Sequence, residues 1–145
     1  MMEGIQVGIF VESRYKVNRK RIQSAIINLL GKHEIKGPVE VSVAVIGNRK
    51  MRQLSKKYKG EDKAQDILSF SLIEGETTYL PQDVLRLGDI VLSYPEVIKQ
   101  ASEEETFVDD KIDELIEHGL EHLLGINHEE EIPSTKFQIP NNTKI

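Results

Sequence analysis

The sequence predicts a single α+β domain whose elements follow the order β-α-β-α-β-β-α-α. Two kinds of pattern lead to this prediction: apolar residues alternate with polar ones in the expected strands, and recur every three or four residues in the expected helices. The chain of 145 residues has the ordinary size of one domain and can bury a core without disulfides. No repeat, linker or low-complexity segment divides the sequence, so we take residues 1–145 as one domain.

The first half of the chain predicts a β-α-β opening. Residues 4–11 (GIQVGIFV) and 39–46 (VEVSVAVI) have the two-residue period of strands. Between them, isoleucine, alanine and leucine residues recur at helical spacing. Asn18 is a suitable N-cap for this helix, and Gly31 is expected to end it.

The second half predicts a helix, two strands and two further helices. The helix covers residues 49–59, and short strands at 66–72 and 88–93 are joined by a loop. A helix follows Pro95, and the last helix covers residues 109–125. The last helix has an apolar stripe that we expect to be buried: Ile112, Ile116, Leu120, Leu123 and Leu124. Residues from about 130 to 145 are expected to form a loosely held tail.

Charge is distributed unevenly along the chain. The formal net charge is -5, but residues 1–63 carry 14 Lys+Arg against 6 Asp+Glu, whereas residues 64–145 carry 5 against 18. This asymmetry fits either a face that binds a polyanion or ordinary solvated helix surfaces. The basic segment 49–63 can expose Arg49, Arg52, Lys56 and Lys59 in one helical row suited to successive phosphates.

The sequence also bears on the compartment. It contains no cysteine, which excludes disulfides and thiolate ligands and fits a reducing environment. Neither a signal peptide nor an apolar run of about 20 residues, as a membrane span requires, is present. We therefore expect a cytoplasmic protein without a membrane partner.

The segment EHGLEHLLGINH (117–128) holds three of the four histidines. His118 and His122 are one helical turn apart, so both rings can bind one ion. Gly125 favours the left-handed conformation that ends a helix and turns the chain back. His128 can then complete the site, so we predict that the three histidines bind one metal ion.

The ligand set indicates a catalytic site. Imidazole ligands suit zinc, nickel, copper or iron, and three protein ligands leave a position for water, as in catalytic zinc sites. The spacing is that of the metzincin signature, but Gly119 stands where a metallopeptidase has glutamate. Phosphodiester cleavage therefore follows more naturally than peptide hydrolysis, with a divergent metallopeptidase as an alternative. His33, the remaining histidine, is interpreted as structural.

Three segments resemble the YbeY family of bacterial endoribonucleases, which are also called ribosomal RNA maturation factors. They are EHGLEHLLGINH, LGDIVLS (87–93) and LSKKYKGEDKAQDILSFS (54–71). Against the family pattern H-G-x-L-H-L-x-G-Y-D-H the chain keeps His118, Gly119, His122, Leu123, Gly125 and His128. The other long segment keeps Tyr58, Asp62, Asp66, Leu68, Ser69 and Phe70. Departures include Glu121 for leucine and Lys59 for arginine.

The resemblance implies an α+β fold with a mixed four-stranded sheet and packed helices. It implies cleavage of ribosomal RNA, especially maturation of the 3′ end of the small-subunit RNA, and ribosome quality control. The three histidines would be ligands of one divalent ion, expected to be zinc, with His118 and Lys59 as catalytic residues. Lys59 occupies the place of an arginine important for catalysis or RNA contact, and offers a point charge in place of a bidentate fork.

The implied partners are ribosomal RNA and, with it, ribosomal proteins or the small subunit; no DNA partner is expected. The alternative is a ribosome-assembly or RNA-binding factor with a structural metal and weak or absent cleavage. Two acidic residues are interpreted as structural: Asp89 as a turn or cap residue, and Glu121 as a solvated carboxylate on the stripe shared with Glu114 and Glu117.

Overall fold

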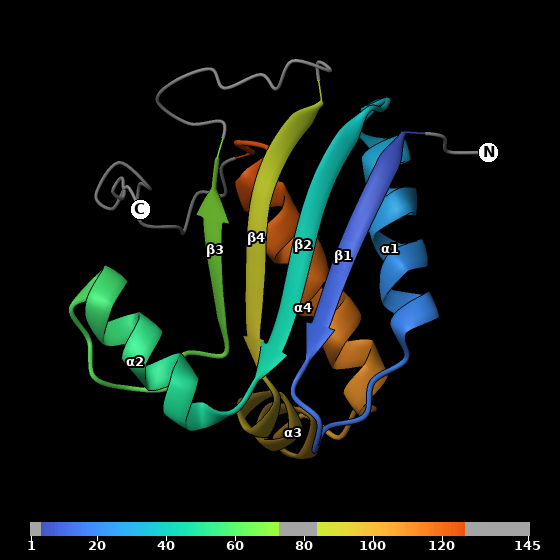
Figure 1. Cartoon of the computed structure of the whole chain (residues 1–145). Coiled ribbons are helices and arrows are strands. Elements are labelled where there is room, and N and C mark those ends of the chain that lie inside the picture. Colours follow the sequence, from blue (N-terminus) through green and yellow to red (C-terminus); the bar gives the residue numbers. More distant parts are fainter. Residues whose placement is uncertain (1–3, 73–83, 127–145) are drawn as a thin grey trace.

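A computed structural model describes residues 4–72 and 84–126 (Figure 1). Its element order is the predicted one. The strands and helices are β1 (Ile5–Val11), α1 (Arg19–Lys32), β2 (Val39–Ile46), α2 (Asn48–Lys59), β3 (Ile67–Ser71), β4 (Leu85–Ser93), α3 (Tyr94–Glu103) and α4 (Val108–Leu123). The strands form one sheet in the order β1-β2-β4-β3, in which only β3 runs antiparallel to its neighbour. The predicted mixed four-stranded sheet is therefore confirmed.

One face of the sheet carries the main core. The alternation of the strands turns Val41, Val43, Ile90 and Leu92 toward this side, where all four are buried. Helices α1 and α4 lie behind the sheet in Figure 1, and residues of α1, α3 and α4 join the same apolar cluster. We call this side the covered face.

The other face is only partly covered. Met51 of α2 is fully buried there, in a cluster with Ile46 of β2, Leu68 of β3 and Val91 of β4. The helix lies beside the β3 edge of the sheet, and the part of this face over β1, β2 and β4 carries no helix in Figure 1. We call this side the open face.

Most predicted boundaries differ from the structure by one or two residues, and α4 ends at Leu123, two residues before the predicted end. Two of the differences have a physical reason. Helix α1 continues through Gly31 and ends at Lys32, because the left-handed residue that follows is Glu34 (φ 61°), whose N–H donates to the Gly31 carbonyl over 2.9 Å. Strand β4 begins at Leu85, three residues before the predicted start. The strand is longer because Leu85 and Arg86 continue the pairing with Val39 and Glu40 of β2. A register shift between Glu40 and Val41 leaves Leu87 as one extra residue in β4.

Gly88 is required by the close approach of β3. It has φ +143°, and a Cβ there would lie 2.1 Å from the Phe70 carbonyl oxygen and 2.9 Å from Leu123 Cδ2. Only glycine fits without displacing backbone. The LGDIVLS segment thus has a structural reason for its glycine.

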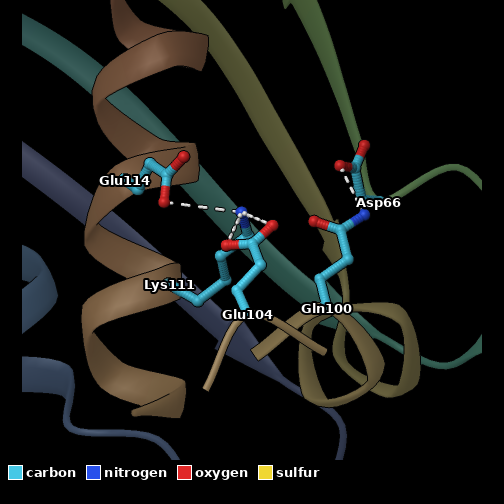
Figure 2. Close-up of polar contacts among 5 residues, drawn as sticks. All are labelled: Asp66, Gln100, Glu104, Lys111 and Glu114. Atoms are coloured by element: carbon cyan, nitrogen blue, oxygen red, sulfur yellow. Dashed lines mark hydrogen bonds and ion pairs between the residues drawn. The ribbon is translucent and has the colours of Figure 1, made fainter. Parts of the chain in front are cut away.

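Polar contacts connect α3 and the residue after it to α4 and to the start of β3 (Figure 2). Lys111 of α4 is only 5% exposed, and its ammonium donates to Glu104 over 3.0 and 3.1 Å and to Glu114 over 3.4 Å. Burial lowers the pKa of Lys111, but the Glu104 hydrogen bond and the Glu114 charge outweigh it, so the pKa is raised. Gln100 of α3 donates to the Asp66 carboxylate over 2.9 Å, which fastens the start of β3.

Candidate functional site

His118 and His122 lie on one side of helix α4, whose orientation is fixed by the burial of its apolar stripe. The predicted stripe is buried at Ile112, Ile116, Leu120 and Leu123, and half-buried at Leu124. This leaves His118 exposed and His122 half-buried, with ring centroids 5.4 Å apart. Two imidazoles that share one tetrahedral zinc at about 2.0–2.1 Å place their centroids about 5 Å apart, so the pair fits a common ion.

The chain reverses at Gly125, as predicted. This residue has φ +80°, its N–H donates to the His122 carbonyl over 3.0 Å, and the N–H of Ile126 donates to the Glu121 carbonyl over 2.9 Å. These bonds satisfy carbonyls at the helix end. His128 lies outside the described residues, and residues 4–72 and 84–126 hold no group of three potential metal ligands. The three-histidine site therefore stays a prediction.

Gly119 faces the sheet. A Cβ at this position would lie 2.9 Å from Ile67 Cδ1, 2.9 Å from Ser69 Oγ and 3.3 Å from Ile90 Cγ2. The missing side chain lets α4 approach β3 and β4 closely. A glutamate here, as in a metallopeptidase, would collide with the sheet.

Lys59 is the last residue of α2, which packs on the opposite face of the sheet from α4 (Figure 1). Both helices contact the edge strand β3. Gly119 of α4 lies next to Ile67 and Ser69 of this strand. Tyr58 of α2 packs against Phe70. Gly60 (φ +73°) ends α2 in the left-handed conformation.

The basic row predicted on α2 is confirmed as a surface feature. Arg49, Arg52, Lys56 and Lys59 are all exposed. Within this row Arg52 Nε lies 3.4 Å from Asp62 Oδ1, and both side chains are more than half exposed. Such a surface pair is weak and leaves the guanidinium accessible to phosphate.

Several residues that match the family segment have structural contacts. The Tyr58 and Phe70 rings meet edge to face at 5.2 Å, which joins α2 to β3. Asp66 accepts from Gln100, and Asp62 accepts from Arg52. These contacts join α2 and α3 to the edge strand β3 and to the loop before it.

The interpretation of Asp89 as a turn or cap residue is wrong. It lies within β4, half-buried, and accepts a hydrogen bond from the Ser42 hydroxyl of β2. Both side chains line a groove of about 560 Å³ on the open face, together with Phe10, Tyr58 and Phe70. Sequence reasoning missed this groove because it follows from strand order, although the alternation of polar and apolar residues in β2 and β4 was a usable signal.

The interpretation of Glu121 as a solvated carboxylate is also wrong. Its side chain is 16% exposed, and Oε2 lies 4.0 Å from Nε2 of His33, the residue that caps α1. The contact between α1 and α4 covers this carboxylate, which helical periodicity alone could not show. His33 has a structural role, as interpreted from the sequence: it is the C-cap of α1, and its backbone N–H donates to the Leu29 carbonyl over 3.1 Å.

Comparison with known proteins gives the family. A family model described as endoribonuclease YbeY matches residues 10–139. The chain belongs to the YbeY family. Endoribonuclease YbeY of a Thermoanaerobacter species is 36% identical over 118 residues, which cover 76% of this chain and 74% of the relative. The Francisella philomiragia YbeY is 29% identical over 141 residues, covering 94% and 87%.

The fold of this chain is also found among solved structures. The solution structure of TM1509 from Thermotoga maritima matches with a TM-score of 0.57 and 25% identity, covering 86% of this chain and 76% of that one. In the part of the chain that is described, no helix has the length and apolar character needed to cross a membrane.

Proposed function

We propose that this chain is a metal-dependent endoribonuclease that matures ribosomal RNA, including the 3′ end of the small-subunit RNA, and serves ribosome quality control. Membership of the YbeY family carries the proposal. The paired imidazoles of α4 and the exposed cations of α2 support it. We place the protein in the cytoplasm, with ribosomal RNA and ribosomal proteins or the small subunit as partners.

His118, His122 and His128 would hold one divalent ion, expected to be zinc. Such an ion supplies Lewis acidity toward a phosphate oxygen and lowers the pKa of a coordinated water toward about 7. The histidines must be neutral to bind it. Helix α4 keeps two of the rings together because its opposite side is buried against the sheet and α1.

Lys59 would stabilise the charge that develops on the phosphoryl group. Its ammonium is a point charge on a flexible stem, in contrast to the fork of the arginine it replaces. Gly119 has no side chain to accept a proton, so proton transfer falls to water, the substrate or another side chain. The side chains of Arg49, Arg52 and Lys56 would bind successive phosphates along the RNA backbone.

The second candidate is an assembly factor that binds RNA but cleaves it weakly or not at all. The observation that favours it is lysine at position 59. The third, a metallopeptidase, is opposed by Gly119, because the sheet occupies the space that a glutamate would need.

The decisive experiment compares cleavage of a structured ribosomal RNA by purified wild type and by the His118→Ala, His122→Ala double variant. Wild type should carry close to one transition-metal ion per chain, and its occupancy should fall below about pH 6 as the imidazoles become protonated. The double variant should lose the metal and at least about a hundredfold in rate. His33→Ala, the control histidine, should keep both.

Two results would contradict the proposal. Equal residual cleavage in wild type and double variant would expose a contaminating nuclease and favour the assembly factor. Full metal occupancy in the double variant would rule out the histidine site.

Substitutions of Lys59 test its role separately. Lys59→Ala should lower the cleavage rate more than RNA affinity, whereas Lys59→Arg should maintain or raise the rate if a bidentate fork stabilises the transition state. A rate loss in Lys59→Arg would show that the site is adapted to lysine, and equal rates in all three proteins would remove Lys59 from the mechanism.

A further inference from the structure

The groove on the open face has aromatic walls from three elements. Phe10 of β1 stands on one side, and Tyr58 of α2 and Phe70 of β3 stand on the other. Phe10 is 55% exposed, although large apolar side chains of this fold are mostly buried. An exposed aromatic ring at the rim of a groove is a typical stacking surface for an unpaired base.

The floor of the groove carries a carboxylate. Asp89 of β4 is half-buried and is held by the Ser42 hydroxyl of the neighbouring strand β2. Most of the surrounding lining is apolar, including Ala44 and Val91. A carboxylate held in apolar surroundings is a strong acceptor for N–H donors, because bonds to a charged acceptor are roughly twice as strong as neutral ones.

Helix α2, which contributes Leu54 and Tyr58 to the groove lining, is strongly cationic. The helix NRKMRQLSKKYK contains six Lys or Arg residues and no acidic residue. Lys57 Nζ lies 5.2 Å from the centroid of the Tyr58 ring, which lines the groove. A cation beside the stacking rings suits the phosphate that follows a bound base.

We propose that this groove binds one unpaired guanine base of an RNA strand. Guanine presents two adjacent N–H donors on its Watson–Crick edge, N1–H and the 2-amino group, which match the two oxygens of Asp89. The other bases offer this carboxylate only one such group. Phe10 contacts the face of the base, and Lys57 contacts the adjoining phosphate.

The groove would therefore select a guanine of the bound RNA strand, held on the opposite face of the sheet from α4. This inference rests on the proposed function for its biological meaning. The surface itself favours RNA over a protein partner, since aromatic walls, a cationic helix and one floor carboxylate together match base, phosphate and N–H donors.

The first test measures binding of a seven-nucleotide RNA, uridines with one central guanosine, by fluorescence anisotropy. Phe10→Ala should weaken binding about tenfold, the loss expected when a base loses its aromatic stacking partner. Phe107→Ala is the matched control, because Phe107 is 79% exposed at the N-cap of α4 and lines no part of the groove. Since Phe10 is largely exposed, its loss should leave folding intact. Equal affinity of wild type and Phe10→Ala would overturn the proposal.

The second test identifies the base contact. Replacing the guanosine by inosine removes the 2-amino group and should weaken binding to wild type about tenfold. Asp89→Asn should weaken guanosine binding similarly and should no longer distinguish guanosine from inosine. If Asp89→Asn still distinguishes them, Asp89 does not read the base.

A third measurement locates the bound base directly. Photocrosslinking with 6-thioguanosine in place of the guanosine should label peptides that contain Phe10, Tyr58 or Phe70. Labelling confined to α1 or α3 would overturn the proposed guanine site. RNA binding that is unchanged in every groove variant would also overturn it, and protection of Phe10 by a purified ribosomal protein would then identify the groove as a protein contact.

Failure of this inference is distinguishable from failure of the proposed function. If groove variants bind and cleave RNA like wild type while the histidine double variant is inactive, the nuclease stands and the guanine site falls. If wild type cleaves no RNA yet binds the guanosine oligomer through Phe10 and Asp89, the guanine site stands without cleavage.

Discussion

The two faces of the sheet differ in what covers them, and this difference separates stability from recognition. On the covered face, Ile90 and Leu92 of β4 are fully buried beneath helices. On the open face, Asp89 of the same strand lines a groove, and Phe10 of β1 is more than half exposed. Because successive residues of a strand point to opposite faces, a single strand serves both purposes.

The covered face also positions the histidines. The buried side of α4 fixes the orientation of its exposed side, so His118 and His122 stay paired only while the core beneath them is intact. Substitutions there should reduce stability and metal binding together. Substitutions on the open face should change RNA binding at nearly constant stability.

The largest expected effect comes from Gly119→Glu on the covered face. A side chain there collides with Ile67 and Ser69, and its carboxylate would be buried without a partner. We expect a loss of about 3–5 kcal/mol in the free energy of unfolding, or no folding, from overpacking and burial of a charge. Urea unfolding measures it.

Gly125→Ala is the control for this substitution. Gly125 has φ +80° and nothing within 4 Å of its position for a Cβ, so alanine introduces backbone strain without a collision. The expected cost is about 1 kcal/mol. Equal losses in both variants would mean that Gly119 matters for conformation and not for the approach of α4 to the sheet.

The next effect comes from Lys111, whose stem is buried while Glu104 and Glu114 are at least half exposed. Lys111→Ala should cost about 1–3 kcal/mol by leaving a cavity, whereas Lys111→Met should stay within about 1 kcal/mol of wild type because it fills the space. Equal losses in Lys111→Met and Lys111→Ala would show that the charges, and not packing, stabilise this contact.

The pH dependence of this contact has a defined sign. Folding raises the pKa of Lys111 above the ordinary 10.5, so its contribution is complete below that pH and is lost as the pH rises through the folded-state value. The difference in unfolding free energy between wild type and Lys111→Met should therefore be constant between pH 5 and 8 and fall in the alkaline range. A change between pH 5 and 8 would contradict this assignment.

The row on α2 should affect RNA binding far more than stability. Replacing Arg52 and Lys56 by alanine should lower the log-log salt slope of RNA binding by about 2, one for each lost phosphate contact. Unfolding free energy should change by no more than about 0.5 kcal/mol, because the Arg52–Asp62 pair is exposed. The matched control replaces Lys32 and Lys99, which are exposed on α1 and α3. An equal slope change in the control would reduce the row to general surface charge.

The sequence predicted the fold well because its signals are local. Alternating valines in β2, the apolar stripe of α4 and Gly125 at its end each act through neighbouring residues. Asp89 and Glu121 were misinterpreted because their surroundings come from distant elements: Ser42 lies 47 residues from Asp89, and His33 belongs to the end of α1. The groove was missed for the same reason, since it depends on which strands are neighbours.

The smallest effect is expected for Glu121→Leu, at the edge of the covered face. The carboxylate is mostly buried beside His33, so leucine removes a poorly solvated charge and adds apolar contact, while His33 loses an acidic neighbour at 4.0 Å. These changes oppose each other, and we expect the unfolding free energy to change by less than about 1 kcal/mol. Metal content and cleavage rate should also stay within about twofold of wild type, because the α1–α4 contact turns this side chain toward His33. Metal analysis, cleavage assays and urea unfolding of the same preparation check all three expectations. A large rate loss at unchanged metal content and stability would make Glu121 a functional carboxylate, and would place part of the chemistry inside the α1–α4 contact.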